Sequence, residues 1–115
     1  AYNLINIKFE VFMLSREEII ERIGIARHNA GLSAKALSEL AGLNKGYINR
    51  LENGKDFLPS LEALLNIIDA CGISEEQFFY HDINTYKQDM ELINSIKNIS
   101  NEKKLAIATL LRKED

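Results

Sequence analysis

The sequence predicts an all-α protein, because three features recur along most of the chain. From residue 15 onward, apolar residues return at spacings of three and four, which places them on one face of a helix. Serine or asparagine precedes most of these runs, and glycine follows most of them, as at the two ends of helices. The apolar residues therefore belong to several short helices joined by tight turns.

One segment departs from this pattern. In residues 4–12 apolar and polar residues alternate, which is the period of a half-buried strand. A lone strand leaves its backbone groups unpaired, so we expect this one, if ordered, to pair with its copy in another subunit. The alternative is that Met13, the last residue of the N-terminal extension 1–13, starts the natural chain and that the residues before it are an upstream addition.

The composition indicates one compact domain with an appendage. The chain has 115 residues, 46% of them hydrophobic, and is too short for two independent cores. Its one cysteine, Cys71, cannot form an internal disulfide or complete a zinc site, which favours a reducing cytoplasm. No apolar run approaches the roughly 20 residues of a membrane-spanning helix. We expect a soluble, cytoplasmic protein that needs no metal or cofactor and contacts no membrane.

Two helices are expected first. One begins at Ser15, which has a glutamate three residues later at capping-box spacing, and it ends near Gly31. Ser33 caps the next, over residues 34–41, which is only about two turns long. Four apolar residues are expected on the buried face of this second helix: Ala36, Leu37, Leu40 and Ala41.

Three further helices follow in the same way. Asn44 is expected to cap the third, which ends at Gly54 in a left-handed backbone conformation. The fourth starts at the proline that precedes Ser60 and runs as far as Gly72. Ser74 then caps a short fifth helix.

The five helices define an expected domain of residues 14–80, and residues 81–115 form a helical extension beyond it. Residues 84–98 and 100–112 each predict a helix. Such a pair either covers an edge of the domain or meets its copy in a dimer, and we favour the dimer. The pair carries an apolar stripe of Met90, Ile93, Ile96, Leu105, Ala108 and Leu111.

The net charge of −3 argues against a nucleic-acid partner until its distribution is considered. Residues 22–55 carry six basic side chains against two acidic ones, a local balance of +4, and the rest of the chain is acidic. A chance fluctuation is the alternative explanation. The six basic residues are Arg22, Arg27, Lys35, Lys45, Arg50 and Lys55.

A sharp connection joins the second and third expected helices, because Gly42-Leu43-Asn44 leaves room only for a steep crossing. In DNA-binding proteins the second helix of such a pair lies in the major groove, while the first crosses the DNA backbone. Eight residues around this connection match one family's spacing: Leu37, Gly42, Ile48, Leu51, Glu52, Gly54, Pro59 and Gly72. On these positions the chain resembles the phage repressor and Cro (Xre-like) family of helix-turn-helix transcriptional regulators, over residues 16–80.

This resemblance implies a five-helix, lambda repressor-like DNA-binding domain. It also implies that DNA bases are read from the start and middle of the third helix, by Asn44, Lys45, Gly46, Asn49 and Arg50. The DNA backbone would be contacted by Ser33, Lys35, Tyr47, Asn53 and Lys55. Arg27 on the first helix would form a structural ion pair with Glu52.

Individual side chains support these roles unequally. Lys45 and Arg50 are the best base-reading candidates, because both can donate to the O6 and N7 edge of guanine; the alternative is that they are solvated helix charges. Asn49 can bond adenine but lies further along the helix. Tyr47 either packs against the first helix, which we favour, or contacts phosphate.

Two positions depart from the family pattern. Ala34 stands where the family often has glutamine, which removes one expected phosphate contact. Ser38 replaces the usual alanine at the crossing of the two helices, where a serine is small enough to fit. Neither departure undermines the expected fold.

The sequence therefore leaves two alternative hypotheses for the function. The first is a dimeric regulator, usually a repressor, that binds double-stranded DNA at an inverted repeat with half-sites about one helical turn apart. The second is an antitoxin or anti-repressor whose C-terminal helices bind a protein partner, with DNA binding secondary or lost. We expect no enzymatic activity, because His28 and His81 are isolated and Cys71 lies on an apolar helix.

Overall fold

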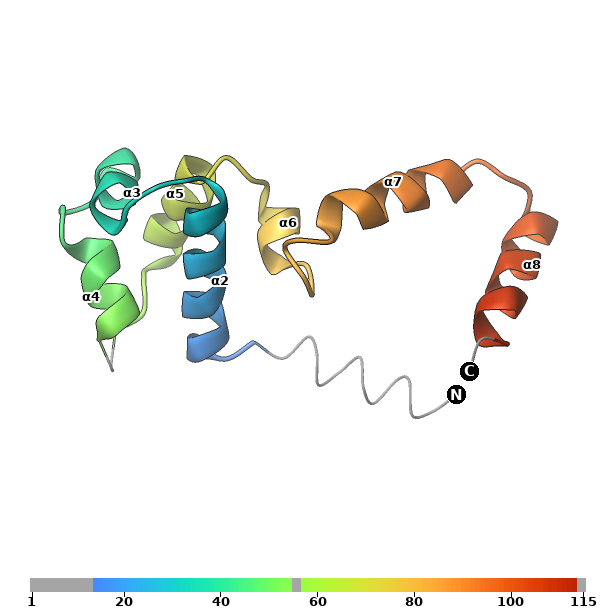
Figure 1. Cartoon of the computed structure of the whole chain (residues 1–115), viewed down its shortest axis with the longest axis horizontal. Coiled ribbons are helices and arrows are strands. Elements are labelled where there is room, and N and C mark those ends of the chain that lie inside the picture. The colour runs from blue at the N-terminus through green and yellow to red at the C-terminus, as the bar shows by residue number, and fades with distance from the viewer. Residues whose placement is uncertain (1–13, 55–56, 114–115) are drawn as a thin grey trace. The chain divides into compact units, whose positions relative to one another are not determined.

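The protein is all-helical in a computed structural model that describes residues 14–54 and 57–113. The expected strand at residues 4–12 lies outside these ranges. Within them the chain forms seven helices and no strand, which confirms the all-α fold class for this part of the chain (Figure 1). The helices are α2 (Arg16–Asn29), α3 (Ala34–Leu40), α4 (Tyr47–Asn53), α5 (Leu61–Ala70), α6 (Glu75–Phe79), α7 (Tyr86–Ile96) and α8 (Asn101–Arg112).

Serine side chains start most of these helices. In each case the hydroxyl oxygen accepts a hydrogen bond from the backbone N–H three residues later, which satisfies one of the unpaired donors of the first turn. A cap of this kind stabilises a helix by about 1 kcal/mol. The five capping residues are Ser15, Ser33, Ser60, Ser74 and Ser100.

The third helix begins later than the sequence predicts. Its expected cap, Asn44, accepts a hydrogen bond from the Gly46 N–H at 3.0 Å through its side-chain oxygen, and its carbonyl accepts one from the Tyr47 N–H at 2.9 Å. An asparagine that bonds its own backbone two residues on forms a turn in place of a helix. Helix α4 therefore starts at Tyr47 and has seven residues.

Two glycines at helix ends behave differently. Gly42 follows α3 with a φ of 73°, the left-handed conformation that favours glycine. Gly54 follows α4 with a φ of −88°, so the expectation of a left-handed conformation there is wrong. A side chain is excluded at Gly54 for another reason: a Cβ atom would lie 2.5 Å from the carbonyl oxygen of Arg50.

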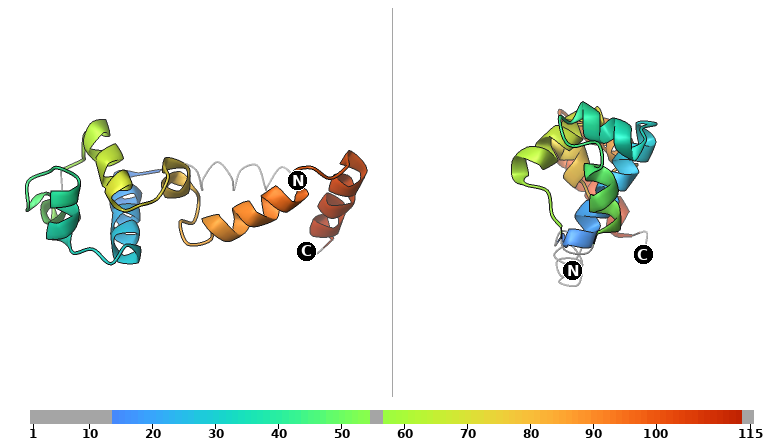
Figure 2. Two further views of the ribbon diagram at one scale, coloured as in Figure 1. Left: turned by 90° about the horizontal axis from the view of Figure 1, so that it is seen from above. Right: turned by 90° about the vertical axis from the view of Figure 1, so that its left-hand side faces the viewer.

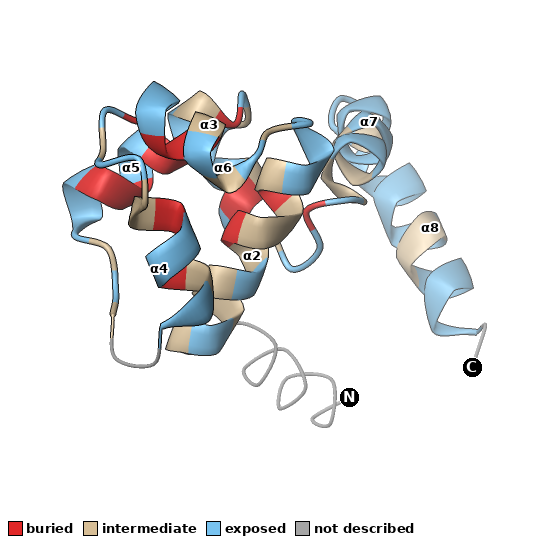
Figure 3. Ribbon diagram, turned by 60° about the vertical axis from the view of Figure 1, so that its left-hand side comes forward, coloured by how far each residue is buried: buried red, intermediate tan, exposed pale blue. Residues whose placement is uncertain are grey.

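The helices up to α6 enclose a common hydrophobic core, and Figure 3 shows the buried faces of these helices. Burial of each large aliphatic side chain in it stabilises the fold by about 1.5–3 kcal/mol. Ile83 also packs in this core, so the first compact unit runs to Ile83, past the expected boundary at residue 80. Its fully buried apolar residues are Ile23, Leu37, Ile48, Leu51, Ile67, Ile68 and Phe78.

The buried face of α3 differs from the expected one. Leu37, Ser38 and Ala41 are buried, whereas Leu40 is 63% exposed. The first three residues are separated by one and three positions and therefore share one face of the helix, while Leu40 lies on the face that turns away. The expectation that Leu40 is buried is wrong, because the polar Ser38 occupies the position at the helix crossing.

The second compact unit begins at Asn84 and contains α7 and α8. Neither helix has a buried residue. Leu92, Leu105 and Leu111 are among the most exposed large apolar side chains of the described chain. None of the helices in the described residues is long and apolar enough to cross a membrane.

Candidate nucleic-acid interface

Helices α3 and α4 form a helix-turn-helix at one end of the first unit, away from α6, as Figures 1 and 2 show from different directions. The turn between them is closed by backbone hydrogen bonds: the Gly42 N–H donates to the Glu39 carbonyl at 3.0 Å, and the Leu43 N–H donates to the Ser38 carbonyl at 2.8 Å. These bonds fix the angle at which α4 leaves α3.

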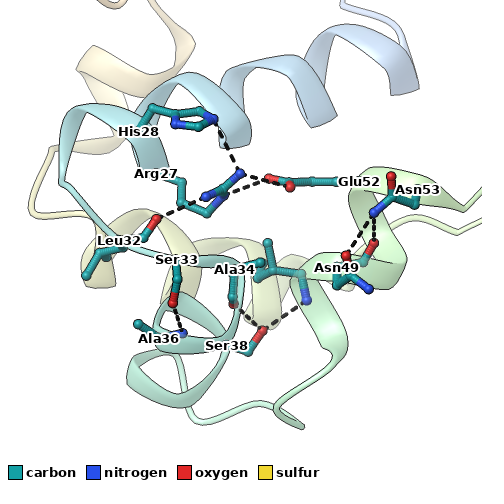
Figure 4. Close-up of polar contacts among 11 residues, drawn as sticks. Arg27, His28, Leu32, Ser33, Ala34, Ala36, Ser38, Asn49, Glu52 and Asn53 are labelled. Carbon is teal, nitrogen blue, oxygen red and sulfur yellow. Dashed lines mark hydrogen bonds and ion pairs between the residues drawn. The ribbon is translucent and has the colours of Figure 1, made fainter.

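Ser38 links the two helices directly. Its hydroxyl donates to the Ala34 carbonyl at 2.8 Å and accepts from the Ile48 N–H at 3.0 Å (Figure 4). Gly46, which precedes α4, has no side chain to cap the helix, so the first turn of α4 receives this acceptor from α3. The sequence indicated only that Ser38 is small enough for the crossing.

Arg27 joins α2 to the far end of α4. Its Nε lies 2.9 Å from Glu52 Oε2 and its Nη2 lies 3.1 Å from Glu52 Oε1, an ion pair with two hydrogen bonds (Figure 4). Its Nη1 donates to the Leu32 carbonyl at 3.0 Å, just before α3. The two paired side chains are 14% and 20% exposed, so this link is largely shielded from water.

Arg16 makes a third link, which was not among the contacts predicted from the sequence. From the first turn of α2, its Nε donates to the Phe57 carbonyl at 3.0 Å and its Nη2 donates to the Gly54 carbonyl at 3.1 Å. Both acceptors lie in the chain that follows α4. A cation is unfavourable in the first turn of a helix, because the backbone dipole is positive there. That misplacement was the signal in the sequence that Arg16 serves a partner elsewhere.

An aromatic cluster lies beside α4. The rings of Tyr47 and Phe57 meet edge to face with centroids 4.9 Å apart, and the Arg50 guanidinium carbon lies 5.7 Å from the centroid of the Phe57 ring. Burial raises the pKa of the Tyr47 phenol, and the Arg50 charge offsets part of this rise. Phe57 was not singled out in the sequence, because an apolar residue in a loop has no distinctive pattern.

A family model described as a helix-turn-helix domain matches residues 14–78. The chain belongs to this helix-turn-helix family. No curated protein and no solved structure matches the chain. The matched range covers α2 to α5 and most of α6, and includes all three links described above. In DNA-binding proteins, the second helix of a helix-turn-helix lies in the major groove.

The structure distributes the five candidate base-reading residues of the helix-turn-helix over two segments. Asn44, Lys45 and Gly46 lie in the turn before α4, and Asn49 and Arg50 lie in the helix itself. All except Gly46 are exposed.

Two of these residues have hydrogen-bond partners for their side chains: the Asn44 oxygen accepts from the Gly46 N–H, and Asn49 is bonded to Asn53. The Asn53 Nδ2 donates to the Asn49 carbonyl at 2.8 Å and to Asn49 Oδ1 at 2.9 Å (Figure 4). The Asn49 carboxamide is therefore held with its oxygen toward Asn53, which leaves its two N–H donors pointing to other partners.

The candidate backbone-contacting residues are placed as follows. Ser33, Lys35 and Asn53 are exposed, and the Ser33 oxygen also caps α3. Tyr47 is half-buried against Phe57. Lys55 lies outside the described residues. Ala34, which stands where the family often has glutamine, has no polar side chain. Its carbonyl already accepts the hydrogen bond from Ser38.

The positive charge of the helix-turn-helix segment is only partly available to a ligand. Arg27 is paired with Glu52, and Arg22 donates to the carbonyls of Phe78 and Tyr80 at the end of α6. The exposed cations of this segment, among the residues described, are Lys35, Lys45 and Arg50. All three belong to α3, the turn or α4.

The chain offers little at this site for covalent chemistry. Cys71 is buried in the core, and burial raises the pKa of its thiol, so the neutral form is favoured. The part of the chain that the structure describes contains no group of three or more His, Cys, Asp or Glu side chains that could hold a metal ion. The arrangement is suited to noncovalent binding.

Proposed function

We propose that the protein is a sequence-specific transcriptional regulator that binds an inverted-repeat operator as a homodimer in the cytoplasm and acts as a repressor. The observation that carries this proposal is a set of three exposed side chains, Lys45 in the turn before α4 and Asn49 and Arg50 on α4 itself. This short helix is fixed at its start by Ser38 and at its end by Glu52. Fixed placement matters, because hydrogen bonds to base edges discriminate only when the donors reach them without rearrangement.

In this proposal α4 enters the major groove. Arg50 and Lys45 donate to guanine, and each good pairing contributes about 1–3 kcal/mol of discrimination. Asn49 donates to a base through its carboxamide N–H groups. Asn44 and Gly46, in the turn before α4, also lie against base edges in this proposal. Lys45 lies in the turn directly before α4.

Residues around α3 hold the phosphates. Ser33 keeps its hydroxyl proton available while its oxygen caps the helix, and Lys35, two residues later, is an exposed cation. Asn53, Lys55 and the Tyr47 hydroxyl complete the proposed set. These contacts position the domain and set its affinity, but they do not specify sequence.

A dimer is proposed because one seven-residue helix reads too few base pairs. A single copy of α4 would find many chance matches in a genome, and a twofold dimer doubles the site. Helices α7 and α8 supply the interface in this proposal, since their apolar residues have no cover within their own unit. The dimer would then hold two copies of α4 about 34–36 Å apart, one turn of DNA.

The same exposed surface favours a second candidate function. A protein partner, rather than a second copy, could cover α7 and α8, as expected of an antitoxin or anti-repressor. The two candidates differ in their need for α4: the regulator requires Lys45 and Arg50, and a module that acts through α7 and α8 does not.

Selection of binding sites from a random duplex pool, with the purified full chain at two salt concentrations, tests the proposal. We expect enrichment of an inverted repeat with half-sites about 10 base pairs apart, bound more weakly at the higher salt concentration. Recovery of no common sequence would contradict sequence-specific regulation and favour the protein-binding module.

A further inference from the structure

The contact between Arg50 and Phe57 suggests how the proposed base-reading arginine is held. The guanidinium carbon lies 5.7 Å from the ring centroid, within the range of a cation–π interaction. We propose that Phe57 is a positioning residue that holds Arg50 ready to bond guanine, and so contributes to sequence discrimination without touching DNA. This inference rests on the proposed function.

Phe57 is itself fixed from two sides. Its ring meets Tyr47 edge to face, and Tyr47 is in the first turn of the same helix as Arg50. Its carbonyl accepts a hydrogen bond from Arg16 in α2, and the same guanidinium holds Gly54 at the end of α4. The ring is therefore placed by α2 and α4 together, and it is a stable surface for the arginine.

The contact leaves the hydrogen-bonding edge of Arg50 available. No hydrogen bond or ion pair joins its guanidinium to another residue in the described part of the chain. Arg27 differs from Arg50 in this respect, because its N–H groups donate to the Glu52 carboxylate and to the Leu32 carbonyl. The contact with the ring needs no hydrogen-bond acceptor, so the N–H groups that bidentate recognition of guanine uses are not taken up by an acceptor within the described part of the chain.

The advantage of this arrangement is a smaller loss of freedom on binding. A free arginine samples many rotamers, and ordering a side chain of this kind at an interface opposes binding. Because Phe57 restricts Arg50 before DNA arrives, most of that ordering has already occurred in the free protein. The effect should appear only with DNA that offers Arg50 its base partner.

The test compares binding of the full chain to the selected site and to a scrambled duplex. Phe57→Leu keeps apolar bulk but removes the ring, and we expect it to lower the ratio of the two affinities by about two- to tenfold. Phe57→Tyr, which restores a ring, should recover the ratio. The ratio does not depend on the folded fraction, because both complexes draw on the same folded protein.

The matched control is Phe79→Leu. Phe79 is also a partly exposed phenylalanine with an edge-to-face partner, Phe78, but it lies in α6. This substitution should leave the ratio unchanged. In the free protein, the NMR resonance of the Arg50 Nε–H should move in Phe57→Leu and stay in place in Phe79→Leu, since only the first loses a ring beside it.

An Arg50→Ala background separates this inference from the proposed function. If Phe57 acts through Arg50, Phe57→Leu has no further effect on the ratio once Arg50 is gone. Losses that add in the double variant, or an unchanged ratio in Phe57→Leu while Arg50→Ala lowers it, would overturn the inference and leave the function intact. An unchanged ratio in Arg50→Ala itself would instead remove the base-reading role on which both depend.

Discussion

The side-chain oxygen of Ser38 accepts a hydrogen bond from the backbone N–H of Ile48 at 3.0 Å, and both residues are fully buried. This bond joins the two helices of the helix-turn-helix at the point where α4 begins. Because the preceding Gly46 cannot cap the helix, Ser38 takes over the role of an N-cap from another helix. The orientation of the proposed reading helix thus depends on one hydroxyl group of α3.

Replacement of this hydroxyl should destabilise the fold. Ser38→Ala leaves the buried Ile48 N–H without an acceptor, and we expect the free energy of unfolding to fall by about 1–3 kcal/mol. Urea unfolding followed by circular dichroism measures it. Ser95→Ala is the matched control, since that exposed serine donates only to the Leu92 carbonyl within α7. Equal midpoints for Ser38→Ala and the unsubstituted chain would mean that water or a shift of α4 satisfies the N–H.

Loss of charge at Glu52 should have a similar effect for a different reason. Glu52→Gln removes the ion pair with Arg27, which is 14% exposed, and leaves that cation short of a partner. Hydrogen bonds to charged groups stabilise by about 1.5–3 kcal/mol, and we expect a loss of this size in the same unfolding assay. The control is Glu39→Gln on the exposed side of α3. A loss no larger than that of the control would show that the pair fixes how α2 and α4 are oriented but does not add to the free energy of unfolding.

Lys35 and Arg50 should differ in what they contribute to DNA binding. Lys35→Ala removes a proposed phosphate contact, so it should weaken binding to all duplexes alike and reduce the salt slope by about one unit. Arg50→Ala should weaken binding to the selected site by about 1–3 kcal/mol and change nonspecific binding much less. Fluorescence anisotropy over a range of salt concentrations measures both. Exchanged effects would place Arg50 on the phosphates and Lys35 on the bases.

The exposed leucines of α8 provide a test of the dimer. Leu105→Glu together with Leu111→Glu puts charge on the proposed interface, and we expect the protein to sediment as a monomer and to bind the operator more weakly. Leu61→Glu is the control, because Leu61 is equally exposed but lies on α5 in the first unit. Dissociation by Leu61→Glu alone would move the interface to the helix-turn-helix unit.

The sequence predicted helices where their signals are local. The Ser33 hydroxyl caps α3 through a hydrogen bond from the backbone of a residue three positions later, so the residue types in this short segment are sufficient to predict the start of the helix. The start of α4 was misplaced because Asn44 can serve either as a cap or as a turn former, and its hydrogen bond from the Gly46 N–H, which makes it a turn former here, cannot be told from the residue type. Leu40 was misplaced because apolar character alone does not tell which face of a short helix is covered.

Contacts between distant residues were harder to predict. Arg16 and Phe57 are 41 positions apart, and their bond exists only because α2 passes beside the chain that follows α4. The pairing of Arg27 with Glu52 was expected from a family resemblance, and spacing along the chain would not have indicated it. Such contacts depend on how helices cross, which propensity and periodicity do not encode.

In the proposed function, the exposed surface of α3, the turn and α4 contacts DNA. The most direct measurement is a titration of the ¹⁵N-labelled full chain with the selected duplex, with the amide resonances followed by NMR. We predict that the amides of residues 33–35 and 44–53 shift on binding, while those of α6 in the same unit stay in place. Binding that shifts α6 and leaves the amides of α4 unchanged would contradict the claim.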